Sequence, residues 1–333
     1  MRRADQRQFS PTEPMDLPTY AIEARGLVKT YAATKTTPAK TALNGIDLQI
    51  PRGSIFGLLG PNGAGKSTFI NILAGLVKKS AGTVKIWDRD IDLRPRDARA
   101  CIGVVSQEIA ADVFFTPRES MEVQAGMYGV PRRERHTMDI LGALGLADKA
   151  DAYVRQLSGG MKRRLMVAKA MVHNPPILIL DEPTAGVDVE LRRQLWNYVV
   201  GLNHLGVTIV LTTHYLEEAQ ELCDTIAIVN RGEVVACEPT SQLLRRLDTR
   251  TVVITPTEPM TVLPNLGRFT GTLRPDGQMA VTFKTADAGV EAVLTAVRDA
   301  GVAIKDLATE DPDLEDVFMA LTYSAPDADP LAY

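Results

Sequence analysis

The residues that could carry out chemistry start with a glycine-rich stretch between an apolar run and a predicted helix. The apolar run spans residues 54–59, and the helical pattern starts at residue 69. Glycines in such a turn let successive backbone N–H groups point at phosphate oxygens, while the helix N-terminus adds partial positive charge. A lysine there reaches the outer phosphates and a hydroxyl ligates Mg²⁺. The pattern predicts a nucleoside triphosphate site made of Gly60, Pro61, Asn62, Gly63, Ala64, Gly65, Lys66, Ser67 and Thr68.

A second candidate feature is a pair of acids at the end of a short apolar run. Residues 177–180 are all aliphatic, and Asp181 and Glu182 follow directly. Alone, the pair could be two solvated charges at a strand end. Beside a phosphate loop, a carboxylate at a strand tip can instead hold Mg²⁺ directly or through water, and this is the role predicted for Asp181. Alternation along the chain points Glu182 differently, toward a water that could attack the terminal phosphate.

The elements that must position these residues follow from the apolar pattern. Short apolar runs at 177–180, 207–212 and 226–229 are separated by helical stretches, which is typical of parallel strands buried on both faces. Residues 230–232 favour a hairpin turn into one more strand. Between these groups the chain turns helical, and the candidate helices are 117–128, 132–144 and 161–173.

The character of the chain changes again after residue 247. The pattern predicts a small α+β unit there, without a catalytic cluster of its own. Aspartate followed by proline at 311–312 is a good helix start. The expected strands are 250–255, 279–284 and 302–307, and the expected helices are 290–300 and a last one after residue 312.

A third motif, Leu-Ser-Gly-Gly-Met at 157–161, precedes the helix predicted at 161–173. Alone it is only a flexible helix cap. Together with the phosphate loop and the acidic strand, in this order, it resembles the signature motif of ATP-binding cassette (ABC) ATPases. The resemblance covers about residues 20–247. The positions that match the family's remaining motifs are Tyr31 (adenine stacking), Gln107 (Q-loop), Ser158, Gly159 and Gly160 (signature), Asp188 (D-loop) and His214 (switch histidine).

Finer matches narrow the family. Residues 157–173 and 181–193 are similar to the ATPase subunits of ABC-2-type exporters, and residues 312–322 resemble the C-termini of drug- and polysaccharide-export ATPases. One departure concerns Tyr31, because the stretch 32–40 after it is longer than is usual in the family. A structural tyrosine at a strand end is the alternative for that residue.

The resemblance implies a P-loop NTPase fold of the ABC type, with a mixed sheet around the phosphate loop and a helical subdomain at about 107–173. The expected domains are an ABC ATPase at 20–247 and a small α+β domain at 248–325. Residues 1–19 are expected to be a disordered tail rather than a signal peptide, because they contain charges and prolines but no apolar core. Residues 326–333 are expected to be a second tail.

The resemblance also implies a mechanism. Two chains, expected to be a homodimer, sandwich two ATP molecules, so that Ser158, Gly159 and Gly160 of one chain contact the γ-phosphate held by the other. Glu182 acts as general base, His214 contacts the γ-phosphate and Lys66 neutralises charge. The implied Mg²⁺ ligands are Ser67, Gln107 and Asp181. The implied partner is a separately encoded membrane permease, so the expected place is the cytoplasmic face of the inner membrane, as a peripheral subunit.

Composition excludes several other classes. The formal net charge of −4 gives no electrostatic footprint for nucleic acid. No run approaches the roughly 18 apolar residues of a membrane span, and the three cysteines lack metal-site spacing. Short basic pairs are expected to be solvated helix faces. These pairs are residues 132–133, 163–164, 192–193 and 245–246.

Some alternatives stay open at this stage. A soluble ABC ATPase acting on ribosomes or DNA is a second function, and an importer ATPase is a third. Phe114 and Phe115 follow Gln107. They could be a core aromatic pair or part of a groove that receives a short helix of the membrane partner.

Overall fold

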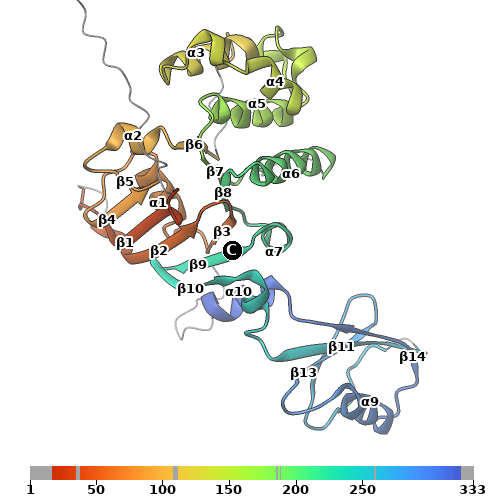
Figure 1. Cartoon of the computed structure of the whole chain (residues 1–333). Helices are drawn as coiled ribbons and strands as arrows, with labels where there is room; N and C mark the ends of the chain where they lie inside the picture. Colours follow the sequence, from red (N-terminus) through yellow and green to blue (C-terminus); the bar gives the residue numbers. More distant parts are fainter. Residues whose placement is uncertain are drawn as a thin grey trace, which may run out of the picture.

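The computed structural model describes residues 17–34, 38–107, 112–184, 187, 189–258 and 260–323. It has the predicted α/β fold, in which two sheets and their surrounding helices form a cassette and a smaller α+β unit follows (Figure 1). The expected tails lie outside the described residues at 1–16 and 326–333.

The centre of the cassette is a six-stranded sheet in the order β10-β9-β3-β8-β7-β6. Its strands are β3 (Ile55–Leu59), β6 (Ile102–Val105), β7 (Ile177–Asp181), β8 (Thr208–Thr212), β9 (Thr225–Asn230) and β10 (Glu233–Pro239). All neighbours except β10 run parallel. β3 and β8 are buried at every position, which confirms the prediction of parallel strands covered on both faces. β10 pairs antiparallel with β9 through the predicted hairpin.

A four-stranded sheet packs beside the central sheet and encloses the helix after the phosphate loop. Its strands are β1 (Tyr20–Tyr31), β2 (Lys40–Pro51), β4 (Ala81–Ile86) and β5 (Arg89–Asp90), paired antiparallel in the order β2-β1-β4-β5. The helix is α1 (Lys66–Leu73). Its Phe69 and Ile72 share one apolar cluster with Ile22 of β1 and Phe56 of β3. The start of α1 is therefore fixed by packing against both sheets.

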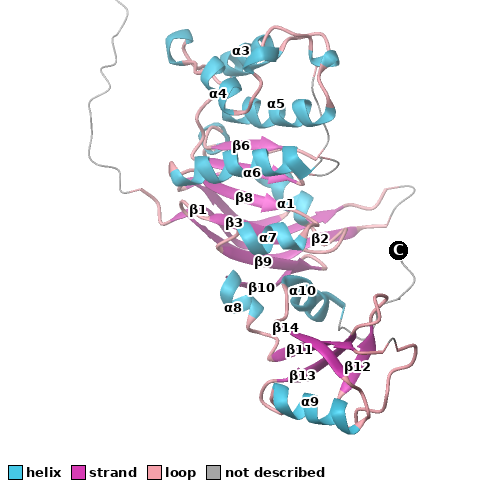
Figure 2. Ribbon diagram, turned by 90° about the vertical axis from the view of Figure 1, so that its right-hand side faces the viewer, coloured by secondary structure: helices cyan, strands magenta, loops and turns pink. Residues whose placement is uncertain are grey.

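Helices cover the rest of the cassette. They are α2 (Pro95–Arg99), α3 (Pro117–Met127), α4 (Thr137–Ala143), α5 (Gly159–Met171), α6 (Val189–His204), α7 (Leu216–Leu222) and α8 (Thr240–Leu244). α3, α4 and α5 form a separate helical layer at one end, at the top of Figure 2. Within the described part of the chain, no helix is both long and apolar enough to cross a membrane.

The helix predicted over 132–144 is wrong in extent. A 3₁₀ turn spans Arg132–Glu134, and α4 begins only at Thr137. Arg135, between them, donates to the Glu122 carboxylate of α3 at 2.6 Å, and Thr137 Oγ1 donates to the same carboxylate at 2.5 Å. These two bonds tie the segment to α3, and the extended backbone of Arg135 (φ −86°, ψ 124°) separates the 3₁₀ turn from α4.

The C-terminal unit is a four-stranded antiparallel sheet in the order β12-β13-β11-β14, with α9 packed on one face. Val293 and Val297 of the helix are fully buried against it. The elements are β11 (Thr249–Pro256), β12 (Thr270–Leu273), β13 (Met279–Lys284), α9 (Val290–Asp299) and β14 (Ile304–Glu310).

The last helix, α10 (Leu314–Tyr323), returns to the cassette. Gln220 Oε1 on α7 accepts a hydrogen bond from the Leu314 N–H at 2.8 Å, and Asn230 Nδ2 donates to the Thr322 carbonyl at 3.1 Å. Leu314 and Val317 belong to the same apolar cluster as the helical layer and α7. The sequence analysis grouped α10 with the C-terminal unit, whereas its buried contacts are with the cassette.

Replacing Leu314 with alanine should therefore destabilise the cassette. Leu314 is 1% exposed, and removal of a buried leucine side chain costs about 2–5 kcal/mol. Both tryptophans, Trp87 and Trp196, pack in the cassette, so their fluorescence in a urea titration reports its unfolding. Met319 on α10 is 46% exposed, and Met319→Ala is the matched control. An unchanged midpoint in Leu314→Ala would mean that α10 lies outside the cooperative unit.

Candidate nucleotide-binding and hydrolysis site

The phosphate loop connects β3 to α1, as predicted. Gly63 and Gly65 have φ angles of +79° and +114°, which favour glycine. A Cβ on Gly65 would also lie 2.5 Å from the Ala42 carbonyl oxygen, so only glycine fits. Lys66 Nζ donates to the carbonyls of Gly60 and Pro61, at 2.5 and 3.2 Å. The Lys66 ammonium group thus lies across the phosphate loop, and this loop has no room for a side chain at Gly65.

The surroundings of Lys66 shift the pKa of its ammonium group. Burial lowers the pKa of the Lys66 ammonium, and the neighbouring carboxylates of Glu182 and Asp181 oppose that shift. A half-buried cation at a helix N-terminus is a site for an anion, and a triphosphate supplies one.

The two acids at the end of β7 are oriented by Thr212, the last residue of β8. Thr212 Oγ1 donates to Asp181 Oδ1 at 2.5 Å, and the Glu182 N–H donates to both Thr212 Oγ1 and the Thr212 carbonyl at 3.1 Å. Thr212 is fully buried. The sequence analysis missed this residue, although a polar side chain that ends an apolar parallel strand is a signal that could have found it.

Two other predicted site residues contact the Glu182 carboxylate. Its Oε2 accepts a hydrogen bond from Gln107 Nε2 at 2.9 Å and lies 3.5 Å from His214 Nδ1. The three residues come from segments that follow β6, β7 and β8. Glu182 has φ +48°, a left-handed conformation that is uncommon for a residue with a side chain and is typical of functional sites. The structure therefore brings together three residues that the resemblance assigned to one site, and their individual roles stay predictions.

The signature residues lie elsewhere. Ser158, Gly159 and Gly160 form the N-terminal end of α5, in the helical layer rather than beside α1 (Figure 1). Ser158 Oγ accepts a hydrogen bond from the Met161 N–H at 3.3 Å and caps the helix. Ser158 and Gly159 are exposed. Asp188 and most of its D-loop lie outside the described residues.

Tyr31 lies beside the phosphate loop. Its hydroxyl is 3.5 Å from Thr68 Oγ1, and Lys29 Nζ is 4.8 Å from the ring centroid. The residue is 38% exposed. The contact with Thr68 is compatible with a structural role for Tyr31. Because the ring is partly exposed, adenine stacking stays a prediction.

The oxygen donors near Lys66 fit a Mg²⁺ ion that arrives with a nucleotide. Mg²⁺ at such sites is bound by one or two carboxylates together with substrate phosphates and water. Asp181 supplies a carboxylate, and Ser67 lies next to Lys66 in the first turn of α1. Within the described residues, no group of three or more His, Cys, Asp or Glu could hold a metal alone. The site therefore suits a metal shared with phosphates rather than one held by the protein alone.

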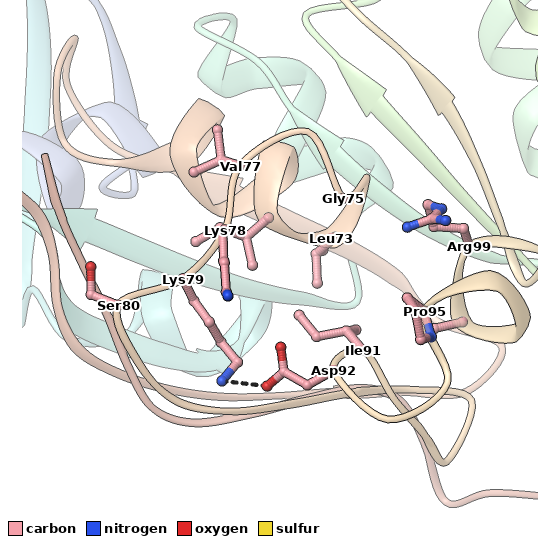
Figure 3. Close-up of a pocket in the computed structure, with 12 residues that line it drawn as sticks. Leu73, Gly75, Val77, Lys78, Lys79, Ser80, Ile91, Asp92, Pro95 and Arg99 are labelled. Atoms are coloured by element: carbon pink, nitrogen blue, oxygen red, sulfur yellow. Dashed lines mark ion pairs between the residues drawn. The ribbon is translucent and has the colours of Figure 1, made fainter.

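A cavity of about 560 Å³ lies at the other end of α1 and is distinct from the phosphate loop. Leu73 and Gly75 line it, and Lys79 pairs there with Asp92 at 2.7 Å (Figure 3). Lys66 begins the eight-residue α1 and Leu73 ends it, so at 1.5 Å per residue roughly 10 Å separates the cavity from the loop.

One expectation about charge is wrong. The sequence analysis treated residues 163–164 as a solvated helix face, but Arg163 is only 3% exposed. Its guanidinium bonds to backbone carbonyls of the segments that contain Gln107 and Glu182. Sequence periodicity alone gave no sign of this contact.

Comparison with known proteins identifies the family of the chain. A model of the ABC transporter family matches residues 43–185. The chain is 40% identical to the daunorubicin/doxorubicin resistance ATP-binding protein DrrA of Streptomyces peucetius, over 68% of this chain and 67% of that protein. It is 35% identical to the Nod factor export ATP-binding protein I of Rhizobium sp. (strain N33), over 91% of this chain and 97% of that protein.

A solved structure matches the cassette. It is a dimeric ATP-binding cassette in a post-hydrolysis state bound to ADP and Pi, with a TM-score of 0.59 and 28% identity over 66% of this chain and 98% of that one. The longer of the two sequence matches also extends through the C-terminal unit. This chain belongs to the ABC transporter family, as an ATP-hydrolysing ATP-binding subunit of the ABC-2-type exporter group.

Proposed function

We propose that this chain hydrolyses ATP within a head-to-tail homodimer and so drives export through a separately encoded ABC-2-type membrane permease. The observation that carries this proposal is the convergence of Gln107 and His214 on the Glu182 carboxylate, next to the cation of Lys66. Phosphoryl transfer needs mainly positioning and charge neutralisation. This arrangement provides both.

Each residue has one task in this proposal. Lys66 binds the outer phosphates, and the backbone N–H groups of the phosphate loop surround them. Ser67, Gln107 and Asp181 would hold Mg²⁺, which would supply positive charge to the phosphate oxygens. Glu182 accepts the proton of the attacking water, and Thr212 fixes the backbone from which the carboxylate extends.

His214 is a further polar group of the site. It is 53% exposed and its ring contacts Tyr215, with 4.2 Å between the ring centroids. The proposed role of His214 is to contact the γ-phosphate while it remains next to Glu182. The adenine base is proposed to stack on Tyr31.

The position of the signature residues supports the proposed dimer. Ser158 and Gly159 are exposed at the N-terminus of α5, where free N–H groups favour an anion. They can contact a γ-phosphate held by a second copy, and the dimeric solved cassette supports this arrangement. Loss of that phosphate on hydrolysis would break the bridge between the subunits, which is the proposed switch.

The membrane partner is proposed to contact the segment after Gln107. Phe114 is 75% exposed and Phe115 is 38% exposed, so Phe114 is a surface residue and not part of a core pair. The segment is tied to the helical layer, because the Phe115 carbonyl accepts a hydrogen bond from the Val154 N–H at 2.9 Å. An exposed aromatic residue on an anchored turn suits a short helix of a permease at the cytoplasmic face of the membrane.

The names of the relatives favour a role in export over a role in import or an action on ribosomes or DNA. Their names describe daunorubicin/doxorubicin resistance and Nod factor export. These two names concern different compounds, so we infer that the permease, rather than this subunit, determines the cargo. The formal net charge of −4 does not favour a nucleic-acid partner.

Replacement of Glu182 by glutamine should lower kcat by roughly 10²- to 10³-fold, because the shape is kept and the base is lost. ATP binding should persist, so the variant should form an ATP-dependent dimer detectable by light scattering. Glu190 on α6 is exposed, and Glu190→Gln should behave like wild type in both assays. Wild-type turnover in Glu182→Gln would contradict its role as base.

Replacement of Lys66 by alanine should weaken ATP binding itself. Loss of a hydrogen bond to a charged group costs about 1.5–3 kcal/mol, which corresponds to a Kd increased by roughly 10- to 150-fold. Titration with a fluorescent ATP analogue measures it. Lys78→Ala is the matched control, because Lys78 lines the cavity at the far end of α1. An unchanged Kd in Lys66→Ala would argue against the phosphate-loop role.

Replacement of Phe114 by alanine should uncouple the subunit from its membrane partner while basal hydrolysis stays within about twofold, since the exposed ring contributes little to folding. Coupling is measured as the stimulation of ATPase activity by the membrane fraction. Leu205 is 83% exposed at the end of α6, and Leu205→Ala is the control. Retained stimulation in Phe114→Ala would contradict docking at this turn, and an unfolded variant would restore the core interpretation.

A further inference from the structure

Arg163 on α5 is the most deeply buried charged side chain beside the hydrolysis site, among the described residues. It is 3% exposed. Its guanidinium donates four hydrogen bonds, all of them to backbone carbonyls. Nη1 donates to Ser106 and Gln107 at 2.8 Å, Nε donates to Pro183 at 2.8 Å, and Nη2 donates to Glu182.

The four carbonyls form two pairs of adjacent residues, and each pair contains one residue whose side chain lies in the site. One pair includes the carbonyl of Gln107, and the other includes that of Glu182. The Gln107 and Glu182 side chains meet at 2.9 Å. A guanidinium is a rigid planar fork, so one group fixes the separation of both backbones. The distance between the two side chains depends on this fork.

The bonds to the Glu182 and Pro183 carbonyls also hold a backbone segment that has an unfavourable conformation. Glu182 has φ +48°, a conformation that persists only when its surroundings hold it. Thr212 holds its N–H side, and Arg163 holds its carbonyl side. The direction of the Glu182 carboxylate therefore depends on contacts at both ends of the residue.

Electrostatics is consistent with a charged fork at this place. Burial lowers the pKa of the Arg163 guanidinium, and the carboxylates of Asp181 and Glu182 oppose that shift. Arginine stays protonated in proteins. The buried charge is accommodated by carbonyl dipoles and by the two nearby acids.

Arg163 also connects two parts of the molecule. It lies in the first turns of α5, whose N-terminus carries Ser158 and Gly159. Any displacement of α5 must either carry the fork with it or break bonds to the Glu182 segment. The position of the signature residues is thereby linked to the position of the carboxylate.

We propose that Arg163 is a positioning residue for hydrolysis, which holds the Gln107 and Glu182 backbones together and links them to the signature helix. The inference rests on the proposed role of Glu182. Arg163 itself contacts neither nucleotide nor the attacking water in this account.

The test compares Arg163→Met and Arg163→Lys with wild type. Methionine removes all four bonds, and lysine keeps the charge but cannot span both carbonyl pairs. We expect kcat to fall roughly 30-fold or more in Arg163→Met and about 10-fold in Arg163→Lys. The Kd for ATP should stay within about twofold, because the phosphate loop is untouched. Wild-type kcat in Arg163→Lys, or a parallel loss of ATP affinity, would overturn the proposal.

The double variant Arg163→Lys with Glu182→Gln separates positioning from general stability. If Arg163 acts through the Glu182 carboxylate, the double variant should be no more than about twofold slower than Glu182→Gln. If the fold-losses of kcat in the two single variants multiply in the double variant, Arg163 acts independently of Glu182, and the proposal is overturned. If Glu182→Gln alone retains wild-type turnover, the proposed function fails instead.

Arg164→Lys is the control at a neighbouring, half-buried arginine on the same helix. Its Nη1 donates to the carbonyls of Leu144 and Gly145, within the helical layer. Arg164→Lys should lower the melting temperature without a selective loss of kcat. An Arg164→Lys variant as slow as Arg163→Lys at equal ATP affinity would show that loss of either arginine of α5 has this effect, and would overturn the specific role of Arg163.

Discussion

Parallel pairing of β3, β8, β7 and β6 brings the carboxyl ends of four strands to one edge of the central sheet, and the chemistry depends on this constraint. The phosphate loop follows β3, His214 follows β8, Glu182 follows β7 and Gln107 follows β6. Ligands of open α/β sheets bind outside the carboxyl ends of the strands for this reason. A change in the order of these strands would separate the groups without altering any motif.

Short polar contacts then convert this rough arrangement into a fixed one. Thr212 connects the ends of β7 and β8 through Asp181 and Glu182. The Arg163 fork connects the ends of β6 and β7 from the side of the helical layer. Both groups are buried, so water does not compete with these bonds. The Glu182 carboxylate is thus positioned by contacts with neighbouring residues.

Much of this could be predicted from the sequence. The buried parallel strands follow from short aliphatic runs, and the phosphate loop follows from glycine spacing, because both are local patterns. Gln107, His214 and the signature residues came from the family resemblance, since their roles depend on contacts between distant segments. Arg163 was missed because nothing local distinguishes a buried arginine from a solvated one, whereas the position of Thr212 at the end of an apolar strand was a usable signal. The cassette contacts of α10 depend on Leu314 and Val317 meeting α7, a tertiary contact that no periodicity reveals.

The central claim is that this subunit works with a membrane permease, and affinity purification tests it most directly. Tagged Glu182→Gln protein is purified from detergent-solubilised membranes with ATP, and the captured proteins are identified by mass spectrometry. A parallel purification of the Glu182→Gln, Phe114→Ala double variant is the control. The account predicts a stoichiometric multi-span membrane protein with the first variant and much less with the second. Recovery of ribosomal or DNA-repair proteins, with no membrane protein, would contradict the account.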